Sequence, residues 1–470
     1  MNELFRRIAP VADELGELFA ARGHELALVG GCVRDVFLGR LGKDLDLTTS
    51  ARPEQVLEIV KDWADAVWTI GIEFGTVGVR KGDRLLEITT YRSESYDPSS
   101  RKPEVSFGDS LEGDLSRRDF TVNAMAVRLP GYVFVDPFGG LGDLAAKVLR
   151  TPGSPEQSFD DDPLRMLRAA RFAAQLGFTV APEVVEAMTA MAGRIDIVSA
   201  ERIRDELDKL ICAPHPRAGL TLLVDTGLAA RVLPELPNLR LEIDEHHRHK
   251  DVYEHTLIVL EQAIAQETGG PDRVLRWAAL LHDIGKPKTR RLEPDGRVTF
   301  HHHEVVGAQM ARKRLTELKF PKDVVADVSR LVELHLRFHG YGSGEWTDSA
   351  VRRYVRDAGH LLERLHKLTR ADCTTRNKRK AAALARAYDQ LEERIARLAK
   401  EEELAKIRPE LNGHEIQEIL GIPPGPLVGK AYKFLLDLRM DRGLIGKEAA
   451  KEALLEWARA NGVLPSGSGG

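Results

Sequence analysis

The chain has 470 residues, of which 43% are hydrophobic and 30% are charged, and its formal net charge is −4. This length exceeds what one hydrophobic core usually supports, about 250–300 residues, so several domains are expected. The slightly negative charge excludes a protein coated with positive charge for nucleic acid, but not a local basic groove. No apolar run approaches the ~20 residues needed to cross a membrane, and acidic residues interrupt the segment where a signal peptide would be apolar. We therefore expect a cytoplasmic protein.

The first 150 residues alternate between helical and strand-like segments, which predicts a mixed α/β domain. Helices are expected over 1–24 and 53–66, and strands over 26–29, 45–48, 76–80, 85–90 and 133–135.

Beyond residue 151 the apolar residues follow helical spacing almost to the end of the chain. Helices are expected over 162–176, 183–192, 200–211, 251–266, 273–281, 305–318, 324–334 and 378–406. A proline cluster at 423–426 should precede two more helices, and residues 466–470 read as a disordered tail. The expected domains are 1–150, a helical neck at 151–240, a third domain at 241–376 and a helical region at 377–470.

A paired-glycine turn and two closely spaced carboxylates mark the first candidate site. Gly30-Gly31 follows a predicted strand, and Asp44 and Asp46 are two residues apart in another. Alternate strand residues face the same side, so the two carboxylates can share divalent ions such as Mg²⁺, and the glycines allow a phosphate to approach the backbone. Glu87, in a third strand-like run, is a candidate for completing the metal site. Either motif alone is also explained by an ordinary turn.

Two further motifs suit a nucleotide. Adjacent Arg117 and Arg118 match the oxygens of a triphosphate, and Asp119 could hold one of them or contact the ribose, although a surface ion pair is the simpler explanation. Asp162 and Arg165 lie three residues apart at the start of a predicted helix and can together pair with the hydrogen-bonding edge of a base. Helix-end stabilisation alone would also explain Asp161 and Asp162, and a solvated face would explain the basic stripe formed by Arg165, Arg168 and Arg171.

These motifs, in this order and followed by Glu201-Arg202-Ile203-Arg204-Asp205-Glu206, resemble the class II tRNA nucleotidyltransferases, the CCA-adding enzymes related to bacterial poly(A) polymerases. The resemblance covers about the first 240 residues. It implies a DNA-polymerase-beta-like head followed by helical regions, catalytic Asp44, Asp46 and Glu87, and Mg²⁺ held by Asp44 and Asp46. It also implies a protein template formed by Asp162 and Arg165, which selects CTP and then ATP. The implied nucleotide-binding residues are Gly30, Gly31, Arg34, Arg117, Arg118, Asp119, Asn123, Asp161, Asp162, Arg165 and Arg168.

Two details bear on this resemblance. The family usually has Glu where this chain has Asp161, a departure that keeps the charge. The segment 92–103 corresponds to a flexible loop that accompanies full CCA addition in the family and is shortened in enzymes that add only CC. Its presence favours addition of all three nucleotides.

A second candidate site lies downstream. Imidazole and carboxylate ligands together suit transition metals or Mg²⁺ and could activate water for phosphate-ester hydrolysis. His255, the pair His282-Asp283 and Asp372 occur in the order of the HD phosphohydrolase superfamily, which the chain resembles over about residues 250–375. The resemblance implies a divalent metal of unspecified identity at these four residues, and the candidates for additional ligands are His335 and the run His301-His302-His303. The histidine-rich run at 246–250 reads as a polar lead-in to the next helix.

The predicted function is therefore template-independent addition of CCA to tRNA from CTP and ATP, with release of pyrophosphate, by a chain that also carries an HD hydrolase site. The expected partners are tRNA, CTP and ATP, with no membrane; the sequence leaves the oligomeric state open. The alternatives are a bacterial poly(A) polymerase, a phosphohydrolase whose head only binds nucleotide or RNA, and an RNA-binding protein without catalysis. Three distant cysteines, Cys32, Cys212 and Cys373, predict reduced thiols.

Overall fold

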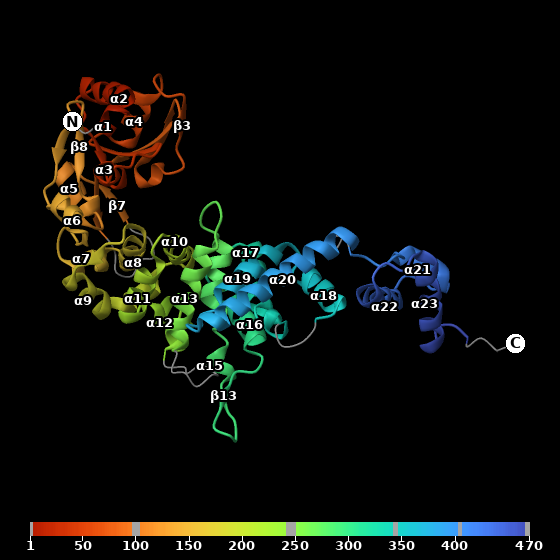
Figure 1. Cartoon of the computed structure of the whole chain (residues 1–470). Helices are drawn as coiled ribbons and strands as arrows, with labels where there is room; N and C mark the ends of the chain where they lie inside the picture. The colour runs from red at the N-terminus through yellow and green to blue at the C-terminus, as the bar shows by residue number, and fades with distance from the viewer. Residues whose placement is uncertain (1–2, 96–103, 241–250, 342–345, 403–406, 466–470) are drawn as a thin grey trace. The chain divides into compact units, whose positions relative to one another are not determined.

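The computed structural model describes residues 3–95, 104–240, 251–341, 346–402 and 407–465 (Figure 1). The chain forms two compact units, one comprising Met1–Asn238 with Glu317–Phe320 and the other comprising Leu239–Thr316 with Pro321–Gly470. The expected tail at 466–470 and the histidine-rich run at 246–250 lie outside the described residues. No described helix is both long enough and apolar enough to cross a membrane.

A seven-stranded sheet forms the centre of the N-terminal head, which confirms the predicted α/β class. Its strand order is β3-β4-β5-β2-β1-β8-β9. β2 and β5 are parallel, and the other neighbouring pairs are antiparallel. The strands are β1 (Leu26–Val29), β2 (Asp44–Thr49), β3 (Ala66–Trp68), β4 (Thr76–Lys81), β5 (Arg84–Thr90), β8 (Ala126–Leu129) and β9 (Val133–Val135).

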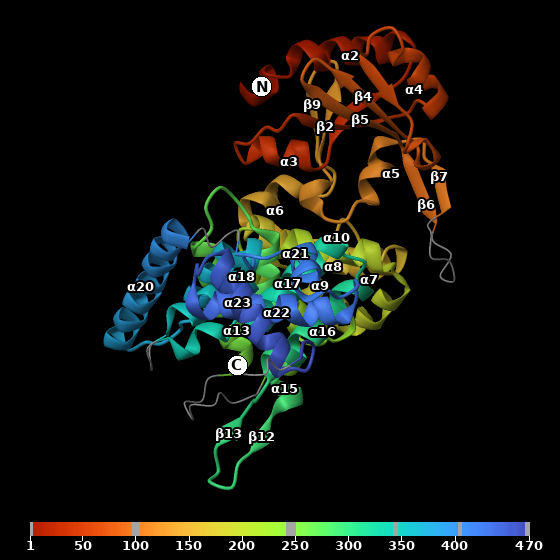
Figure 2. The same ribbon diagram turned by 90° about the vertical axis from the view of Figure 1, so that its right-hand side faces the viewer.

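Helices α2 and α4 cover one face of this sheet, and α3 lies on the other side (Figure 2). Leu45 and Leu47 of β2 are buried, whereas the alternating Asp44 and Asp46 are exposed. Because successive strand residues face opposite sides, β2 directs its leucines into the core and these two aspartates toward the candidate site. The remaining elements of the head are α1 (Glu3–Arg6), α2 (Ala9–Ala21), α3 (Gly31–Phe37), α4 (Pro53–Val60), η1 (Ile72–Phe74), the antiparallel pair β6 (Arg92–Ser95) and β7 (Glu104–Phe107), α5 (Leu111–Ser116), η2 (Thr121–Asn123), α6 (Gly140–Ala146) and β10 (Val148–Leu149).

Three local expectations for the head were wrong. The helix expected over 1–24 is divided into α1 and α2, with Pro10 in the first turn of α2, where its missing N–H has no helical acceptor. The helix expected over 53–66 ends at Val60, because the following chain turns and Ala66 joins the sheet as the start of β3. Strand β8 was not foreseen, because its residues do not alternate between buried and exposed: Ala126, Val127 and Leu129 are all buried.

The helical neck packs around α8, which lies against α10 and α11. A single helix was expected to open at Asp161-Asp162, but the structure has two: Asp161 ends α7, and α8 begins after Pro163. Asp162 between them is extended (φ −145°, ψ 99°), because a residue before proline is disfavoured in the helical region. The elements are α7 (Pro155–Asp161), α8 (Leu164–Leu176), β11 (Thr179–Val180), α9 (Pro182–Met191), η3 (Ala192–Ile197), α10 (Ala200–Ile211), α11 (Pro216–Asp225), α12 (Ala229–Val232) and η4 (Pro237–Leu239).

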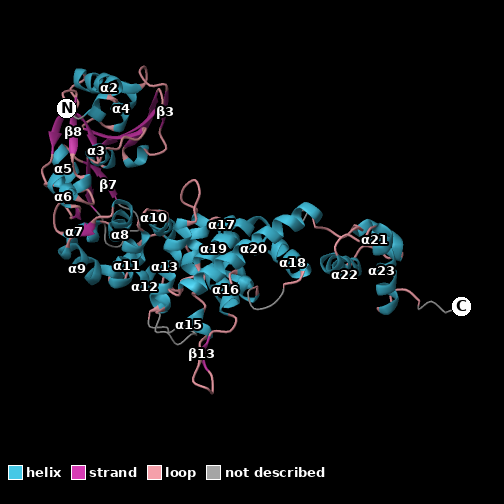
Figure 3. Ribbon diagram, viewed as in Figure 1, coloured by secondary structure: helices cyan, strands magenta, loops and turns pink. Residues whose placement is uncertain are grey.

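In its described residues, the second unit has one short hairpin, and its other regular elements are helices (Figure 3). Its centre is α14, which packs against α13, α17 and α19 and buries Trp277 completely. The elements are α13 (Val252–Ala265), α14 (Arg273–Leu281), α15 (Lys286–Thr289), β12 (Arg291–Leu292), β13 (Val298–Thr299), α16 (His303–Glu317), α17 (Lys322–Leu334), η5 (Arg337–Gly340), α18 (Asp348–Ala358), η6 (Gly359–Leu361), α19 (Leu362–Ala371) and α20 (Lys378–Glu402).

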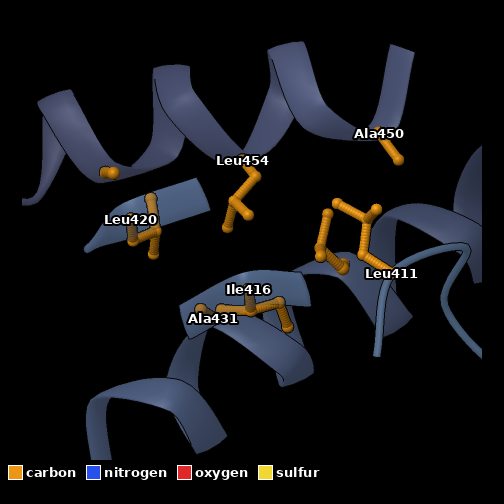
Figure 4. Close-up of a cluster of buried hydrophobic side chains, with 8 residues drawn as sticks. Leu411, Ile416, Leu420, Ala431, Ala450 and Leu454 are labelled. Atoms are coloured by element: carbon orange, nitrogen blue, oxygen red, sulfur yellow. The ribbon is translucent and has the colours of Figure 1, made fainter. Parts of the chain in front are cut away.

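Three C-terminal helices share a small apolar core of their own. Ile416, Leu420 and Leu454 are among its buried side chains (Figure 4). The helices are α21 (Gly413–Leu420), α22 (Pro426–Arg442) and α23 (Lys447–Ala460). Pro426 opens α22, as the proline cluster predicted, whereas α21 was not foreseen.

Candidate functional site

Strands β2 and β5 bring three candidate carboxylates to one side of the head. Asp44 and Asp46 share a face of β2, and Glu87 of β5 stands directly opposite Asp46 in the parallel register. Although Asp46 is exposed to the pocket, partial withdrawal from water raises the pKa of its carboxyl, and the charges of Glu87 and Asp44 raise it further against the opposing effect of Arg118. A bound Mg²⁺ would offset the repulsion between these carboxylates and accept their oxygens as ligands, so the residues fit such an ion.

The paired-glycine turn lies next to these carboxylates. Gly30 has a φ of 73°, which favours glycine, and a Cβ there would stand 3.2 Å from Arg118 Nη1. Cys32, in the first turn of α3, donates its thiol to the backbone carbonyl of Asp46 at 3.6 Å, and burial raises its pKa to about 11. None of the three cysteines, all of which lie within the described residues, forms a disulfide.

A chain of polar contacts connects α3 with α8. Arg34 Nη1 donates to Asn123 Oδ1 at 2.6 Å, and Asn123 Nδ2 donates to Asp119 Oδ1 at 3.0 Å. The other Asp119 oxygen is 2.9 Å from Arg168 Nη2. Burial alone would raise the pKa of Asp119, but the adjacent Arg168 cation and the Asn123 hydrogen bond bring it below its ordinary value. Asp119 therefore holds Arg168 in place as a carboxylate.

The proposed base-reading pair is held by fixed neighbours. Asp162 accepts the Leu164 N–H at 3.1 Å with Oδ1, and its Oδ2 lies 3.1 Å from Arg202 Nη2. Arg165 donates to Ser158 Oγ at 3.1 Å and to the backbone carbonyl of Arg117. Asp162 and Arg165 are both buried, so their side chains are positioned before any ligand arrives.

One pocket of about 670 Å³ collects these groups, and head and neck both line it. Eight arginines and five carboxylates line the pocket, so positive charge is in excess there although the chain as a whole is slightly negative. The lining includes most of the sequence-predicted residues: Gly30, Gly31, Arg34, Asp46, Glu87, Arg117, Arg118, Asp119, Asn123, Asp162, Arg165 and Arg168.

Two predicted site residues are not among the lining residues. Asp44 lies beside Asp46 at the exposed start of β2, and Asp161 points its carboxylate to Gln157 Nε2 at 2.8 Å. Asp161 leaves the site because the chain turns at Asp162 and ends α7 there.

Arg202 and Phe172 are among the pocket residues that the sequence did not single out. Arg202 of α10 reaches Asp162 from 40 positions further along the chain, and the only available signal was its place in the Glu201–Glu206 motif. Three guanidinium groups lie near the ring of Phe172 in α8. Their Cζ atoms are 4.2 Å (Arg171), 5.4 Å (Arg34) and 5.9 Å (Arg168) from the ring centroid. Arg171 also forms a buried ion pair with Glu206.

The second unit contains a compact cluster at the ends of several helices. His255 Nε2 is 2.9 Å from Asp372 Oδ1, and His282 Nε2 is 3.2 Å from Asp283 Oδ2. The four predicted residues therefore lie together. His303 and His335 complete the cluster, whereas His301 and His302 of the same histidine run are exposed.

The donor set of this cluster suits a divalent cation. Burial would lower the pKa of His282, but Asp283 and Asp372 outweigh it and raise that pKa to about 10. The buried Nε2 of His282 lies 3.2 Å from Asp283 Oδ2 and 3.3 Å from Asp372 Oδ1, and Lys286 Nζ lies 3.3 Å from Asp283. Imidazole nitrogens mixed with carboxylate oxygens are ligands of first-row transition metals.

Comparison with known proteins agrees with this architecture. Three family models match: "Poly A polymerase head domain" over residues 26–150, "Probable RNA and SrmB- binding site of polymerase A" over 177–239 and "HD domain" over 252–377. An A-adding tRNA nucleotidyltransferase from Deinococcus radiodurans is 34% identical over 439 residues, which cover 92% of this chain and 95% of that protein. A CCA-adding enzyme from Anoxybacillus flavithermus is 30% identical over 464 residues, 98% of each chain.

The chain belongs to the tRNA nucleotidyltransferase family that contains these CCA-adding and A-adding enzymes. Its fold is also that of a solved member: the crystal structure of the Bacillus stearothermophilus CCA-adding enzyme in complex with CTP superposes with a TM-score of 0.69 at 27% identity, covering 96% of this chain and 98% of that one. Like other nucleotidyltransferases and HD-domain proteins, this family member has groups suited to divalent metals.

Proposed function

We propose that this tRNA nucleotidyltransferase adds CCA to the 3′ end of tRNA, using CTP and ATP and releasing pyrophosphate. The observation that carries the proposal is that one pocket joins strand carboxylates, an excess of arginines and the pair Asp162 and Arg165. If this pair reads the incoming base, the enzyme needs no nucleic-acid template. A related enzyme crystallised with CTP supports the assignment.

The carboxylates would hold Mg²⁺. Asp44, Asp46 and Glu87 supply the oxygen donors that this ion prefers, and a bound ion would offset the negative charge of the triphosphate and favour ionisation of the attacking hydroxyl. Arg117 and Arg118 present guanidinium donors for the phosphate oxygens, to which a bidentate donor is well matched.

The pair Asp162 and Arg165 would select the base by its hydrogen-bonding edge. Cytosine and adenine each carry an exocyclic amino group, which donates to the Asp162 carboxylate, next to a ring nitrogen that accepts from Arg165. Uracil and guanine place a carbonyl where the amino group stands, and a carboxylate repels that carbonyl. The pair therefore accepts CTP and ATP and rejects UTP and GTP.

In the reaction, the 3′-hydroxyl oxygen of tRNA forms a bond to the α-phosphorus, and the bond from that phosphorus to the bridging oxygen of the β-phosphate breaks. The hydroxyl proton goes to solvent, and pyrophosphate leaves. The protein's part is to align the reactants and to stabilise the charge on the phosphates with fixed cations. Arg168 and Arg34, held through Asp119 and Asn123, are fixed in this way.

The test uses the purified chain with Mg²⁺ and two tRNA transcripts, one without the CCA end and one ending in CC, with products resolved at single-nucleotide length. We expect CTP alone to add two residues to the first transcript, and CTP with ATP to add three and then stop. UTP and GTP should give no extension. Failure to extend either transcript would refute the proposal.

A second candidate has support in the relative named A-adding tRNA nucleotidyltransferase. An enzyme that adds only the terminal A would extend the transcript ending in CC with ATP and leave the shorter transcript unchanged. The interpretation of 92–103 as a CCA-type loop falls largely on residues 96–103, outside the described residues, so the two transcripts decide the matter. A long ladder with ATP alone would indicate a poly(A) polymerase instead.

For the second unit we propose a metal-dependent phosphohydrolase site formed by His255, His282, Asp283 and Asp372. A bound divalent ion would make water a better nucleophile at neutral pH. The water oxygen would form a bond to phosphorus, the ester P–O bond would break, and the leaving oxygen would take up the proton. The metal-loaded chain should release product from a phosphodiester, a 2′,3′-cyclic nucleotide or a phosphomonoester, and Asp283→Asn should abolish the release. Absence of metal-dependent release from all three classes would contradict the proposal.

A further inference from the structure

One row of residues crosses four neighbouring strands of the head sheet. Asp46 of β2 stands opposite Glu87 of β5. Glu87 stands opposite Gly78 of β4, and Gly78 stands opposite Trp68 of β3. Residues that stand opposite each other in a sheet direct their side chains to the same face. Trp68 therefore shares the face of the candidate catalytic carboxylates, although no sequence motif singled it out.

The glycine in this row makes room for the indole of Trp68. A Cβ at Gly78 would overlap that ring, with the indole Nε1, Cε2 and Cδ1 as its nearest atoms, so the ring lies over the backbone of β4. Gly78 is buried, whereas Trp68 is only half-buried. Neighbouring strands are about 4.8 Å apart, so the ring extends from the edge strand across β4 toward Glu87. A partly exposed aromatic surface thus borders the proposed Mg²⁺ ligands.

The carboxylates lie between this ring and the groups that suit a triphosphate. In the strand order β3-β4-β5-β2-β1, Trp68 belongs to the edge strand β3, and Gly30 directly follows β1. Arg118 is on the side of β1, since its Nη1 would stand 3.2 Å from a Cβ at Gly30. Trp68 and the glycine turn therefore flank the metal ligands of β5 and β2 from opposite sides.

The geometry of nucleotidyl transfer gives these two sides different roles. In an in-line displacement the attacking and leaving oxygens lie on opposite sides of the phosphorus. With the pyrophosphate facing Gly30 and Arg118, the tRNA hydroxyl arrives from the side of β4 and β3, and its base lies beside Trp68. Aromatic side chains hold the unpaired bases of RNA ends by stacking, with little regard to base identity. Because the terminal nucleotide changes with each addition, such a tolerant platform suits this position.

We infer that Trp68 binds the 3′-terminal base of tRNA by stacking on it, and that this contact positions the terminal hydroxyl for attack. The inference rests on the proposed nucleotide addition and extends it from the incoming nucleotide to the acceptor end. Trp68 is not among the residues that line the nucleotide pocket. Its loss should therefore weaken the use of tRNA and leave the binding of the nucleoside triphosphate unchanged.

Steady-state kinetics of the full chain separate stacking from packing. We expect Trp68→Ala and Trp68→Leu to raise the KM for the tRNA transcript about tenfold, the change that one base–aromatic stack accounts for, with the KM for the nucleotide unchanged. Trp68→Phe keeps a ring and should stay close to the wild type. The matched control is Val67→Ala, which trims the preceding residue of β3, opposite the buried Val79 and so on the other face. An unchanged tRNA KM in Trp68→Ala, or a wild-type KM in Trp68→Leu, would overturn the inference.

A binding measurement tests the stack without catalysis. The fluorescence of 2-aminopurine, placed as the last nucleotide of the transcript, falls when its base stacks on an aromatic ring. Saturating wild type and Trp68→Phe, without nucleoside triphosphate, should quench it, whereas saturating Trp68→Ala should not. Thermal melts establish that the variants fold.

Equal quenching by the wild type and Trp68→Ala, or no quenching by the wild type, would overturn the inference. A wild type that quenches the transcript but adds no nucleotide would support the stack and refute the proposed nucleotide addition, so the two failures are distinguishable.

Discussion

We propose phosphate chemistry for both the pocket of the first unit and the histidine cluster of the second unit, but the two sites are built in opposite ways. The pocket is open, about 670 Å³ in volume, and its lining contains eight arginines and five carboxylates. The cluster is largely buried: His282, Asp283 and His335 are each 3% exposed or less, whereas His255 and Asp372 are half-buried. An open, positively charged pocket suits a large anion that enters and leaves, whereas a largely buried set of imidazole and carboxylate groups suits a small cation.

The two regions also differ in how their charges are balanced within the protein. In the pocket, Asp119 holds Arg168 and Asp162 lies against Arg202, so ion pairs set the positions of groups that would face a nucleotide. In the cluster, carbonyl oxygens set the orientation of the rings. Mutations should therefore act on catalysis, selectivity and local stability in the first region and on metal content in the second.

The largest effect is expected for Asp46→Asn. Loss of one carboxylate from the proposed Mg²⁺ site should reduce nucleotide addition about 10³-fold, a value typical of removing a group that stabilises charge in the transition state. Because the Asp46 charge is crowded by Glu87 and Asp44, the metal-free variant should melt slightly above the wild type. Asp83→Asn, in the exposed turn before β5, is the matched control. Equal addition rates for Asp46→Asn and Asp83→Asn would show that the pocket carboxylates are not the catalytic ones.

The next effect is on stability. Glu206→Gln leaves the buried Arg171 guanidinium without its charged partner, and breaking a buried ion pair on one side costs about 3–5 kcal/mol. Chemical denaturation of the wild type and the variant measures the difference. Asp295→Asn, which removes an exposed pairing with Arg297, should leave the denaturation midpoint unchanged. A wild-type midpoint for Glu206→Gln would mean that the pair does not support the neck.

A smaller effect is expected on selectivity. Asp162→Asn replaces an acceptor-only carboxylate with an amide that can also donate, so discrimination against UTP and GTP should fall by about 1–3 kcal/mol, the usual value of a bidentate base contact. The measurement is kcat/KM for each of the four nucleotides. Asp161→Asn is the control, because Asp161 is adjacent to Asp162 in the sequence but lies outside the pocket lining. Unchanged preference in Asp162→Asn would place base recognition elsewhere.

The smallest effect depends on pH. The pKa of Asp119 is lowered in the folded protein, so its charged form adds stability at neutral pH, and this contribution is lost as pH falls below about 4, toward the folded-state pKa. Asp119→Asn should therefore melt below the wild type at pH 7, and the gap should narrow at acidic pH. Thermal melts across this range measure it. A gap that does not change with pH would show that packing, and not the charge pair with Arg168, accounts for the loss.

The sequence predicted what depends on local spacing. The strand period placed Asp44 and Asp46 on one face, and the order of His255, His282-Asp283 and Asp372 predicted residues that the structure brings together. It failed where the position of a side chain depends on a partner far along the chain or on a turn. The ion pair of Arg202 with Asp162 spans 40 positions, and nothing in the run His301-His302-His303 shows that only the third residue is buried. Asp161 was expected in the site, but the proline at position 163 changes the direction of the chain between it and Arg165.

The most direct test of the nucleotide pocket is a crystal structure of this chain with CTP and Mg²⁺. We expect the cytosine amino group within hydrogen-bond distance of Asp162, Arg165 facing the cytosine ring, and the triphosphate between Arg118 and the carboxylates of Asp46 and Glu87. A nucleotide bound outside this pocket, or one whose base does not contact Asp162 and Arg165, would contradict the proposal that these two side chains read the base.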